Sequence, residues 1–110
     1  MAEEILLVIS TFPDPETARR IAQQLVTEKL AACANITAPV QSIYHWQGRV
    51  ENAQETMVFF KTTAERFPQL TTELQELHPY DVPEIVALQI ADGAPAYLRW
   101  VAESCARHFV

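Results

Sequence analysis

The chain has 110 residues, of which 49% are hydrophobic, and a formal net charge of −6 at pH 7. This length predicts a single domain, residues 1–110, with a core of modest size. Basic residues are fewer than acidic ones and form no cluster, which argues against a nucleic-acid partner. No apolar run approaches the roughly 20 residues of a membrane span, so we expect no membrane partner either.

The N-terminal residues indicate where the protein works. The first four, MAEE, are acidic, and the apolar run that follows covers only residues 5–9. A secretory signal has a basic start and a longer apolar stretch. We therefore expect a cytoplasmic protein, in which Cys33 and Cys105 are reduced thiols rather than a disulfide.

The first third of the chain predicts a strand, a helix and a second strand. Residues 5–9 (ILLVI) form an apolar run of strand length, and the proline at position 13 cannot continue a ladder. Asp14 is the expected N-cap of a helix whose apolar residues recur at helical spacing as far as Leu30. Residues 31–36 then predict a short buried strand.

The stretch 40–63 predicts a long β-hairpin. Its turn falls at positions 47–49 (QGR), where glycine supplies the backbone freedom that a tight turn needs. In the second arm, residues 57–60 (MVFF) are apolar on both faces. A strand whose two faces both avoid water must be covered twice. Because a small domain has few elements for this, we expect another copy of the chain to cover one face.

The rest of the chain predicts a helix at 66–77, a strand at 84–90 and a last helix to about position 106, with Asp92 as its candidate cap. The order is β-α-β-β-α-β followed by a C-terminal helix. This order is typical of the ferredoxin-like, split-βαβ fold of the α+β class, an antiparallel sheet with two helices on one face. The opposite face is expected to be bare, in agreement with the doubly apolar hairpin arm.

Five stretches occur in one order along nearly the whole chain: 28–35 (EKLAACAN), 42–51 (SIYHWQGRVE), 60–63 (FKTT), 78–84 (HPYDVPE) and 97–100 (YLRW). Together they resemble the CutA family, the divalent-cation tolerance proteins. The resemblance implies a ferredoxin-like fold and a tight homotrimer whose long hairpins pair across subunits. It also implies a role in the response to copper and other divalent metal ions.

The copper ligands proposed for some family members are only partly present here. Those ligands are a cysteine at the end of the first strand and two histidines before the Pro-Tyr step. Ser10 stands in place of the cysteine and Leu77 in place of the first histidine, which leaves His78. Cys33 matches another cysteine of the family and is the second metal candidate. The resemblance thus implies no obligatory cofactor, and copper or another divalent metal as the ion to test.

Structural roles compete with metal binding at both candidates and are favoured. His78 ends a helix, where an imidazole can bond free backbone carbonyls. Cys33 lies in an apolar segment, and free cysteine is among the most buried residue types. We therefore expect packing at Cys33, and the same at Cys105.

The segment 78–84 places an imidazole, a phenol and two carboxylates in a loop stiffened by two prolines. Binding residues are common in such loops. The resemblance places comparable residues in clefts between subunits, so the expected intersubunit pocket contains Trp46, Lys61, Tyr80 and Glu84. Interface hydrogen bonds and salt bridges are the competing role of this set. The expected trimer interface contains Tyr44, Trp46, Met57 and Phe59.

Two functional hypotheses follow. The first is a trimeric divalent-cation tolerance protein that responds to metal ions and binds copper(II). The second is a trimeric small-molecule sensor or signalling scaffold with intersubunit clefts, similar to the PII regulators. No nucleophile-with-base pattern or cofactor motif is present, so we do not expect an enzyme. The expected partners are further copies of the chain and a divalent metal ion.

Overall fold

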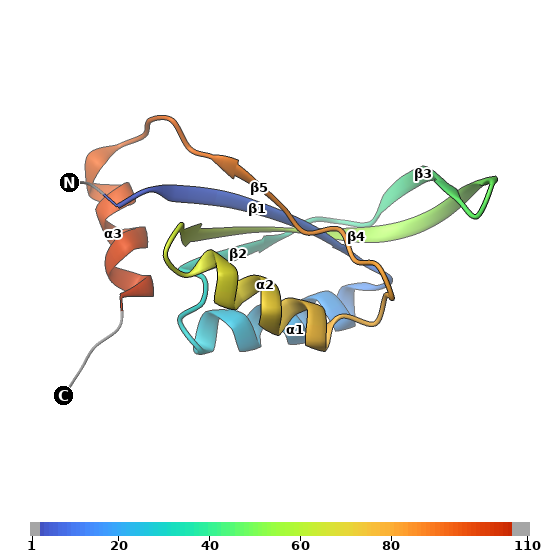
Figure 1. Cartoon of the computed structure of the whole chain (residues 1–110), viewed down its shortest axis with the longest axis horizontal. Coiled ribbons are helices and arrows are strands. Elements are labelled where there is room, and N and C mark those ends of the chain that lie inside the picture. The colour runs from blue at the N-terminus through green and yellow to red at the C-terminus, as the bar shows by residue number, and fades with distance from the viewer. Residues whose placement is uncertain (1–2, 107–110) are drawn as a thin grey trace.

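The computed structural model describes residues 3–106, and its elements follow the predicted order (Figure 1). The strands and helices are β1 (Ile5–Phe12), α1 (Pro15–Thr27), β2 (Cys33–Ile36), β3 (Val40–Trp46), β4 (Arg49–Thr63), α2 (Phe67–Leu77), β5 (Val86–Gln89) and α3 (Pro95–Cys105). None of these helices has the length and apolar content needed to cross a membrane.

The strands form one antiparallel sheet that is built around β4. Strand order is β2-β4-β1-β5, and β3 also pairs with β4. The N-terminal half of β4, as far as Glu55, pairs with β3, and the half from Thr56 pairs with β1 and β2. The α+β, ferredoxin-like arrangement predicted from the sequence is therefore confirmed.

The hairpin turn consists of Gln47 and Gly48, whose φ angles are 51° and 78°. Two successive positive φ values characterise the two-residue turn that matches the twist of paired strands, and glycine adopts such angles without strain. The predicted turn is confirmed. It joins a strand of 7 residues to one of 15.

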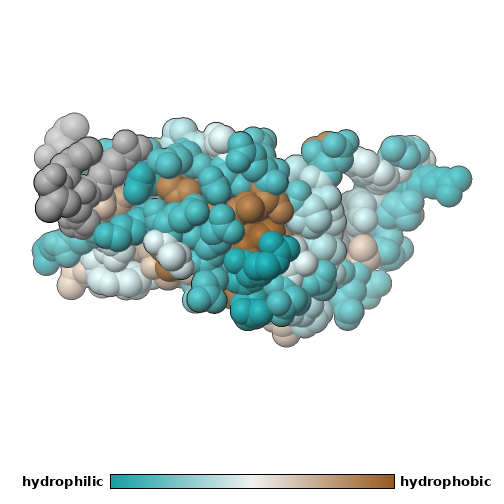
Figure 2. Space-filling model, turned by 90° about the horizontal axis from the view of Figure 1, so that it is seen from below, coloured by the Kyte–Doolittle hydropathy of each residue, from teal (hydrophilic) through white to brown (hydrophobic). Residues whose placement is uncertain are grey.

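The two faces of the sheet have different surroundings. Helices α1 and α2 lie against one face (Figure 1), and their outer surface is mostly hydrophilic (Figure 2). Side chains on the helix-covered face are fully buried, among them Val8, Phe12, Val58 and Phe60. The opposite face is not bare throughout, contrary to the expectation from the sequence, because α3 packs on one end of it and buries Ile5. The apolar side chains of β1 and β4 beyond α3 are half-buried and two of β5 are exposed: Leu7, Ile9, Met57, Phe59, Val86 and Leu88. We call these six residues the open apolar face.

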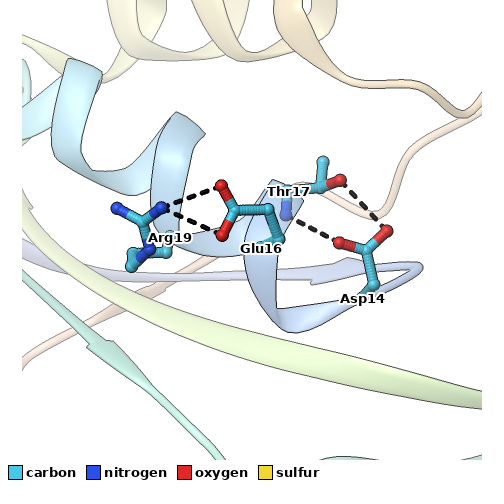
Figure 3. Close-up of polar contacts among 4 residues, drawn as sticks. All are labelled: Asp14, Glu16, Thr17 and Arg19. Carbon is cyan, nitrogen blue, oxygen red and sulfur yellow. Dashed lines mark hydrogen bonds and ion pairs between the residues drawn. The ribbon is translucent and has the colours of Figure 1, made fainter.

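Helix α1 begins at the predicted cap (Figure 3). The Asp14 carboxylate accepts from the Thr17 backbone N–H at 2.7 Å and from the Thr17 hydroxyl at 3.1 Å. These hydrogen bonds favour the ionised form and lower the pKa of Asp14. Glu16 and Arg19 form an ion pair at 2.8 Å one turn into the helix.

Two boundaries differ from the expected ones near the start of the chain. β1 continues three residues past position 9 and ends at Phe12, because only Pro13 interrupts the ladder. α1 ends at Thr27, before Leu30, because Lys29 adopts a left-handed conformation with φ of 62°. Leu30 is still buried, so it is apolar because it belongs to the core and not because it continues the helix.

The expected cap of the last helix was wrong. Ala94 occupies the N-cap position of α3 and makes no side-chain hydrogen bond. The carboxylate of Asp92 instead accepts from the Gly93 backbone N–H at 2.8 Å, in the loop before the helix. An aspartate that bonds its neighbour's N–H shapes the loop and leaves the helix end uncapped.

Two threonines on the helix-covered side of β4 form a matched pair for a stability test. The Thr56 hydroxyl is buried without a partner among the described residues, whereas the Thr62 hydroxyl donates to the Leu30 carbonyl at 2.6 Å. We predict that Thr56→Val raises the free energy of unfolding by about 1 kcal/mol and that Thr62→Val lowers it by about as much. Urea unfolding at one protein concentration measures both. A destabilised Thr56→Val protein would contradict the assignment of an unpaired hydroxyl.

Candidate functional site

The site is formed where the loop after α2 passes the end of β1. The helix ends as the His78 backbone N–H donates to the Leu74 carbonyl at 2.9 Å. His78 then takes an extended conformation, with φ of −72° and ψ of 135°, because the proline that follows disfavours the helical region. This change of direction sends residues 79–84 across the end of the sheet toward β5.

The imidazole of His78 is buried, with 7% of the residue exposed, and stacks on Phe12 at a centroid distance of 4.6 Å. Nε2 lies 2.8 Å from the Thr11 carbonyl oxygen, and Nδ1 accepts from the Tyr80 backbone N–H at 3.1 Å. Because a carbonyl oxygen only accepts, Nε2 carries the proton and donates it to Thr11. Both ring nitrogens are therefore engaged in the neutral tautomer.

Burial lowers the pKa of His78 below its ordinary value. The hydrogen bond to Thr11 and the nearby Glu55 carboxylate act in the opposite direction, and they do not outweigh desolvation. The neutral form is consequently the one that the folded protein stabilises. It holds the loop against β1 through Tyr80 on one side and Thr11 on the other.

Tyr80 follows in the loop and reaches β4. Its hydroxyl donates to Glu55 Oε2 at 2.7 Å, and its ring lies 4.8 Å from that of His78. Glu55 itself is only 8% exposed. Burial, together with this hydrogen bond, raises the pKa of Tyr80 well above its usual value. The phenol thus stays protonated and remains a donor to the carboxylate.

A cavity of about 650 Å³ opens beside this contact, between the hairpin and the loop. Its lining includes three aromatic and three acidic side chains: Tyr44, Trp46, Tyr80, Glu55, Asp81 and Glu84. Three of the four residues predicted for a pocket, Trp46, Tyr80 and Glu84, are therefore brought together in one chain. Whether the cavity lies between subunits stays a prediction.

The fourth predicted pocket residue, Lys61, lies elsewhere in the chain. Its ammonium group donates to Asn35 Oδ1 at 2.7 Å, and the sheet register places it opposite Cys33. It is not part of the cavity lining that the structure describes. In a single chain Lys61 and the cavity are therefore separate, and their meeting across a subunit boundary stays a prediction.

Glu55 was missed by the sequence reasoning, although a signal for it existed. It has the same parity along β4 as Met57 and Phe59, so alternation places all three on the face predicted to be covered by another copy. A carboxylate in that register requires a partner. The partner, Tyr80, is 25 residues away in sequence, and no local pattern identifies it.

His78 and Cys33, the two candidate metal ligands, make separate contacts in this structure and not with each other. His78 would have to break one of its two hydrogen bonds to coordinate an ion. Cys33 is half-buried, and its Sγ lies 3.7 Å from the Tyr97 hydroxyl, on the side of the sheet without α1 and α2. The expectation of core packing was wrong for Cys33 and is confirmed for Cys105, which is buried. Within residues 3–106 no three Cys, His, Asp or Glu side chains are grouped closely enough to hold a metal ion.

The fold and this site define a ferredoxin-like α+β protein with an extended hairpin and a cavity at the hairpin's base. The sequence model of one family, described as CutA1 divalent ion tolerance protein, matches residues 6–104. The chain belongs to the CutA1 family of divalent ion tolerance proteins, and the resemblance noted in the sequence is confirmed. The family is named for divalent ion tolerance and not for a catalysed reaction.

Individual relatives agree with this assignment. The divalent-cation tolerance protein CutA of Thermus thermophilus is 51% identical over 102 residues, which are 93% of this chain and 97% of that protein. The crystal structure of CutA1 from Oryza sativa superposes with a TM-score of 0.93 at 36% identity, covering 97% of this chain and 98% of that one. The human Protein CutA is 38% identical over 93 residues, and this chain spans 52% of its length. The chain likewise spans about half, 54%, of the chloroplastic Protein CutA of Arabidopsis thaliana.

The depressed pKa of His78 predicts a pH-dependent stability. Its folded value lies below the unfolded value of about 6.5, so the stabilisation is complete above pH 6.5 and is lost as pH falls through the folded value. Protonation of Nδ1 removes the acceptor for the Tyr80 N–H. His78→Gln cannot titrate, and we expect its urea midpoint to fall less than that of the wild type between pH 7.5 and 5.5. His45→Gln, at an exposed position, is the control, and its urea midpoint should fall as much as that of the wild type over the same pH range. A His78→Gln protein whose urea midpoint also falls as much as that of the wild type would contradict the assignment of the pH dependence to His78.

The two hydrogen bonds of the His78 imidazole also predict how the protein binds copper. Because both nitrogens of His78 are engaged, we expect His78→Ala to bind copper(II) as the wild type does. Calorimetric titration of the tag-free wild type, His78→Ala and His45→Ala measures this directly. Loss of about one ion per chain in His78→Ala alone would show that the imidazole leaves Thr11 or Tyr80 to coordinate the metal.

Proposed function

We propose that this protein works as a homotrimer in the tolerance of divalent cations. Family membership supports the cation part of the proposal, since relatives from Thermus thermophilus and Pyrococcus horikoshii are named divalent-cation tolerance proteins. The open apolar face is the observation that supports a homotrimer. A cytoplasmic location and a non-catalytic role belong to the same proposal, although some relatives are described as chloroplastic or periplasmic.

The open apolar face supports assembly because its exposure is costly for a chain on its own. Val86 is 46% exposed and Leu88 is 50% exposed, next to half-buried residues of β1, which in turn pair with half-buried residues of β4. Contiguous apolar surface of this kind marks interaction sites in folded proteins. On the hairpin, Tyr44 and Trp46 are 41% and 45% exposed. The proposed interface therefore joins the hairpin, through these two aromatic residues, to the open apolar face, through Met57 and Phe59.

Divalent metal ions enter this proposal as ligands rather than as an obligatory cofactor. Copper(II) is the metal that the family resemblance implies, with His78 and Cys33 as the candidate ligands in this chain. Oxygen ligands from the 14 acidic residues are the alternative source of weak cation binding. The copper titration of the His78 variants separates these two sources.

A second candidate function is favoured by the cavity. Ligand sites are concave, contain aromatic side chains and include a small number of placed polar groups. The cavity combines these features, with Tyr80 and Glu55 fixed against one another at 2.7 Å. We therefore also propose a small-molecule sensor or scaffold role, comparable to that of the PII regulators.

The proposed assembly predicts the effect of a charge on the open apolar face. Phe59→Lys places an ammonium group in an interface that excludes water, so we expect it to dissociate the trimer. The control is Gln23→Lys on the exposed side of α1, which adds the same charge away from the face and should leave the assembly intact. Sedimentation velocity of both variants at equal concentration measures the outcome. A Phe59→Lys protein that sediments as the wild type does would refute burial of this face.

A further inference from the structure

Glu55 is a buried carboxylate without a counter-charge among the residues that the structure describes. It is 8% exposed, and it is the only acidic residue that is buried within residues 3–106. The one ion pair in that part of the chain joins Arg19 to Glu16. The hydrogen bond that Glu55 accepts at 2.7 Å comes from the neutral phenol of Tyr80. A buried charge is costly unless an opposite charge lies beside it, so Glu55 requires a cation from outside its own chain.

Lys61 is a half-buried cation that also has no counter-charge in the described part of the chain. Its ammonium group donates to Asn35 Oδ1 at 2.7 Å. An ammonium group has three donors, so a single neutral acceptor leaves two of them for another partner. Asn35 is exposed, and its bond therefore holds the ammonium group near the surface.

The two charges lie at opposite ends of one face of β4. Residues 55, 57, 59 and 61 alternate onto the same side of the strand, so Met57 and Phe59 of the proposed interface lie between Glu55 and Lys61. Six residues of strand span about 20 Å, which is too far for an ion pair within the chain. Each copy thus presents an acidic end, an apolar middle and a basic end to its neighbours.

We propose that Glu55 of each copy pairs with Lys61 of the neighbouring copy in the homotrimer. In a ring of three chains each contact joins unlike patches, so each copy uses Glu55 toward one neighbour and Lys61 toward the other. The ammonium group enters the cavity beside Tyr80, which occupies one of the several acceptor positions of the carboxylate. This pairing rests on the proposed homotrimer and names the charges that align its subunits.

The other carboxylates of the cavity are weaker partners for the neighbour's ammonium group. Asp81 and Glu84 are exposed, and water screens an ion pair at such positions so that little is gained by forming it. Glu55 is already buried before the copies meet. Pairing therefore offsets a cost that the separate chain carries, and loss of either partner leaves a charge unpaired in the interface.

Charge reversal tests this pairing. The exchange of subunits between isotope-labelled and unlabelled trimers, followed by native mass spectrometry, measures how firmly the copies are held. We expect Glu55→Lys and Lys61→Glu each to accelerate exchange at least tenfold, because each places like charges in the contact. The double variant interchanges the two charges and should exchange within threefold of the wild-type rate. Glu76→Lys and Arg20→Glu, at exposed positions on α2 and α1, are the matched controls and should leave the rate unchanged.

The outcomes separate the ion pair from the assembly itself. A trimeric wild type whose double variant exchanges as fast as the single variants would overturn the pairing and leave the homotrimer standing. Unchanged exchange in both single variants would do the same. A monomeric wild type would overturn both proposals.

Neutral substitutions repeat the test if charge reversal prevents folding. Glu55→Gln keeps an acceptor for Tyr80, and Lys61→Gln keeps a donor for Asn35. Each should accelerate exchange at least tenfold because it leaves the opposite charge unpaired. The double neutral variant should exchange no faster than either single variant, since it leaves no unpaired charge. Additive effects of the two neutral substitutions would contradict the pairing.

Discussion

The pairing of β4 constrains the rest of the molecule. This strand of 15 residues holds β3 with its first half and β1 and β2 with its second half. Its register sends Val58 and Phe60 to the helices and Met57 and Phe59 to the open apolar face. A shift of one residue would exchange the two sets, so the core and the proposed interface are determined together. The proposed interface is thus a direct consequence of how the core is built.

His78 has a comparable role for the cavity. Its imidazole joins the end of α2 to the last residues of β1 through Thr11, and to the loop through Tyr80. Tyr80 in turn orients the Glu55 carboxylate. His78, one of the two metal candidates in the sequence, is in this geometry a structural link between a helix and the loop that lines the cavity.

Most of the fold was predictable because its signals are local. The alternation in β4, the glycine in the turn and the Asp14 cap each specify backbone geometry within a few residues. The site was predictable only in part, because its contacts depend on the register of distant segments. The partner of His78 is 67 residues away, and Lys61 was grouped with the loop although it pairs with Asn35. Sequence patterns identified candidate functional residues but not the hydrogen-bond partners that determine their roles.

In the proposed assembly, other copies of this chain cover the open apolar face. Sedimentation equilibrium of the wild-type protein, at concentrations from about 1 to 100 µM, tests it without any substitution. We predict one species with the mass of three chains across this range, because burying Val86, Leu88 and Phe59 against a partner is favourable. A monomer throughout the range would contradict it. That result would mean that the face stays exposed to water or awaits a different partner.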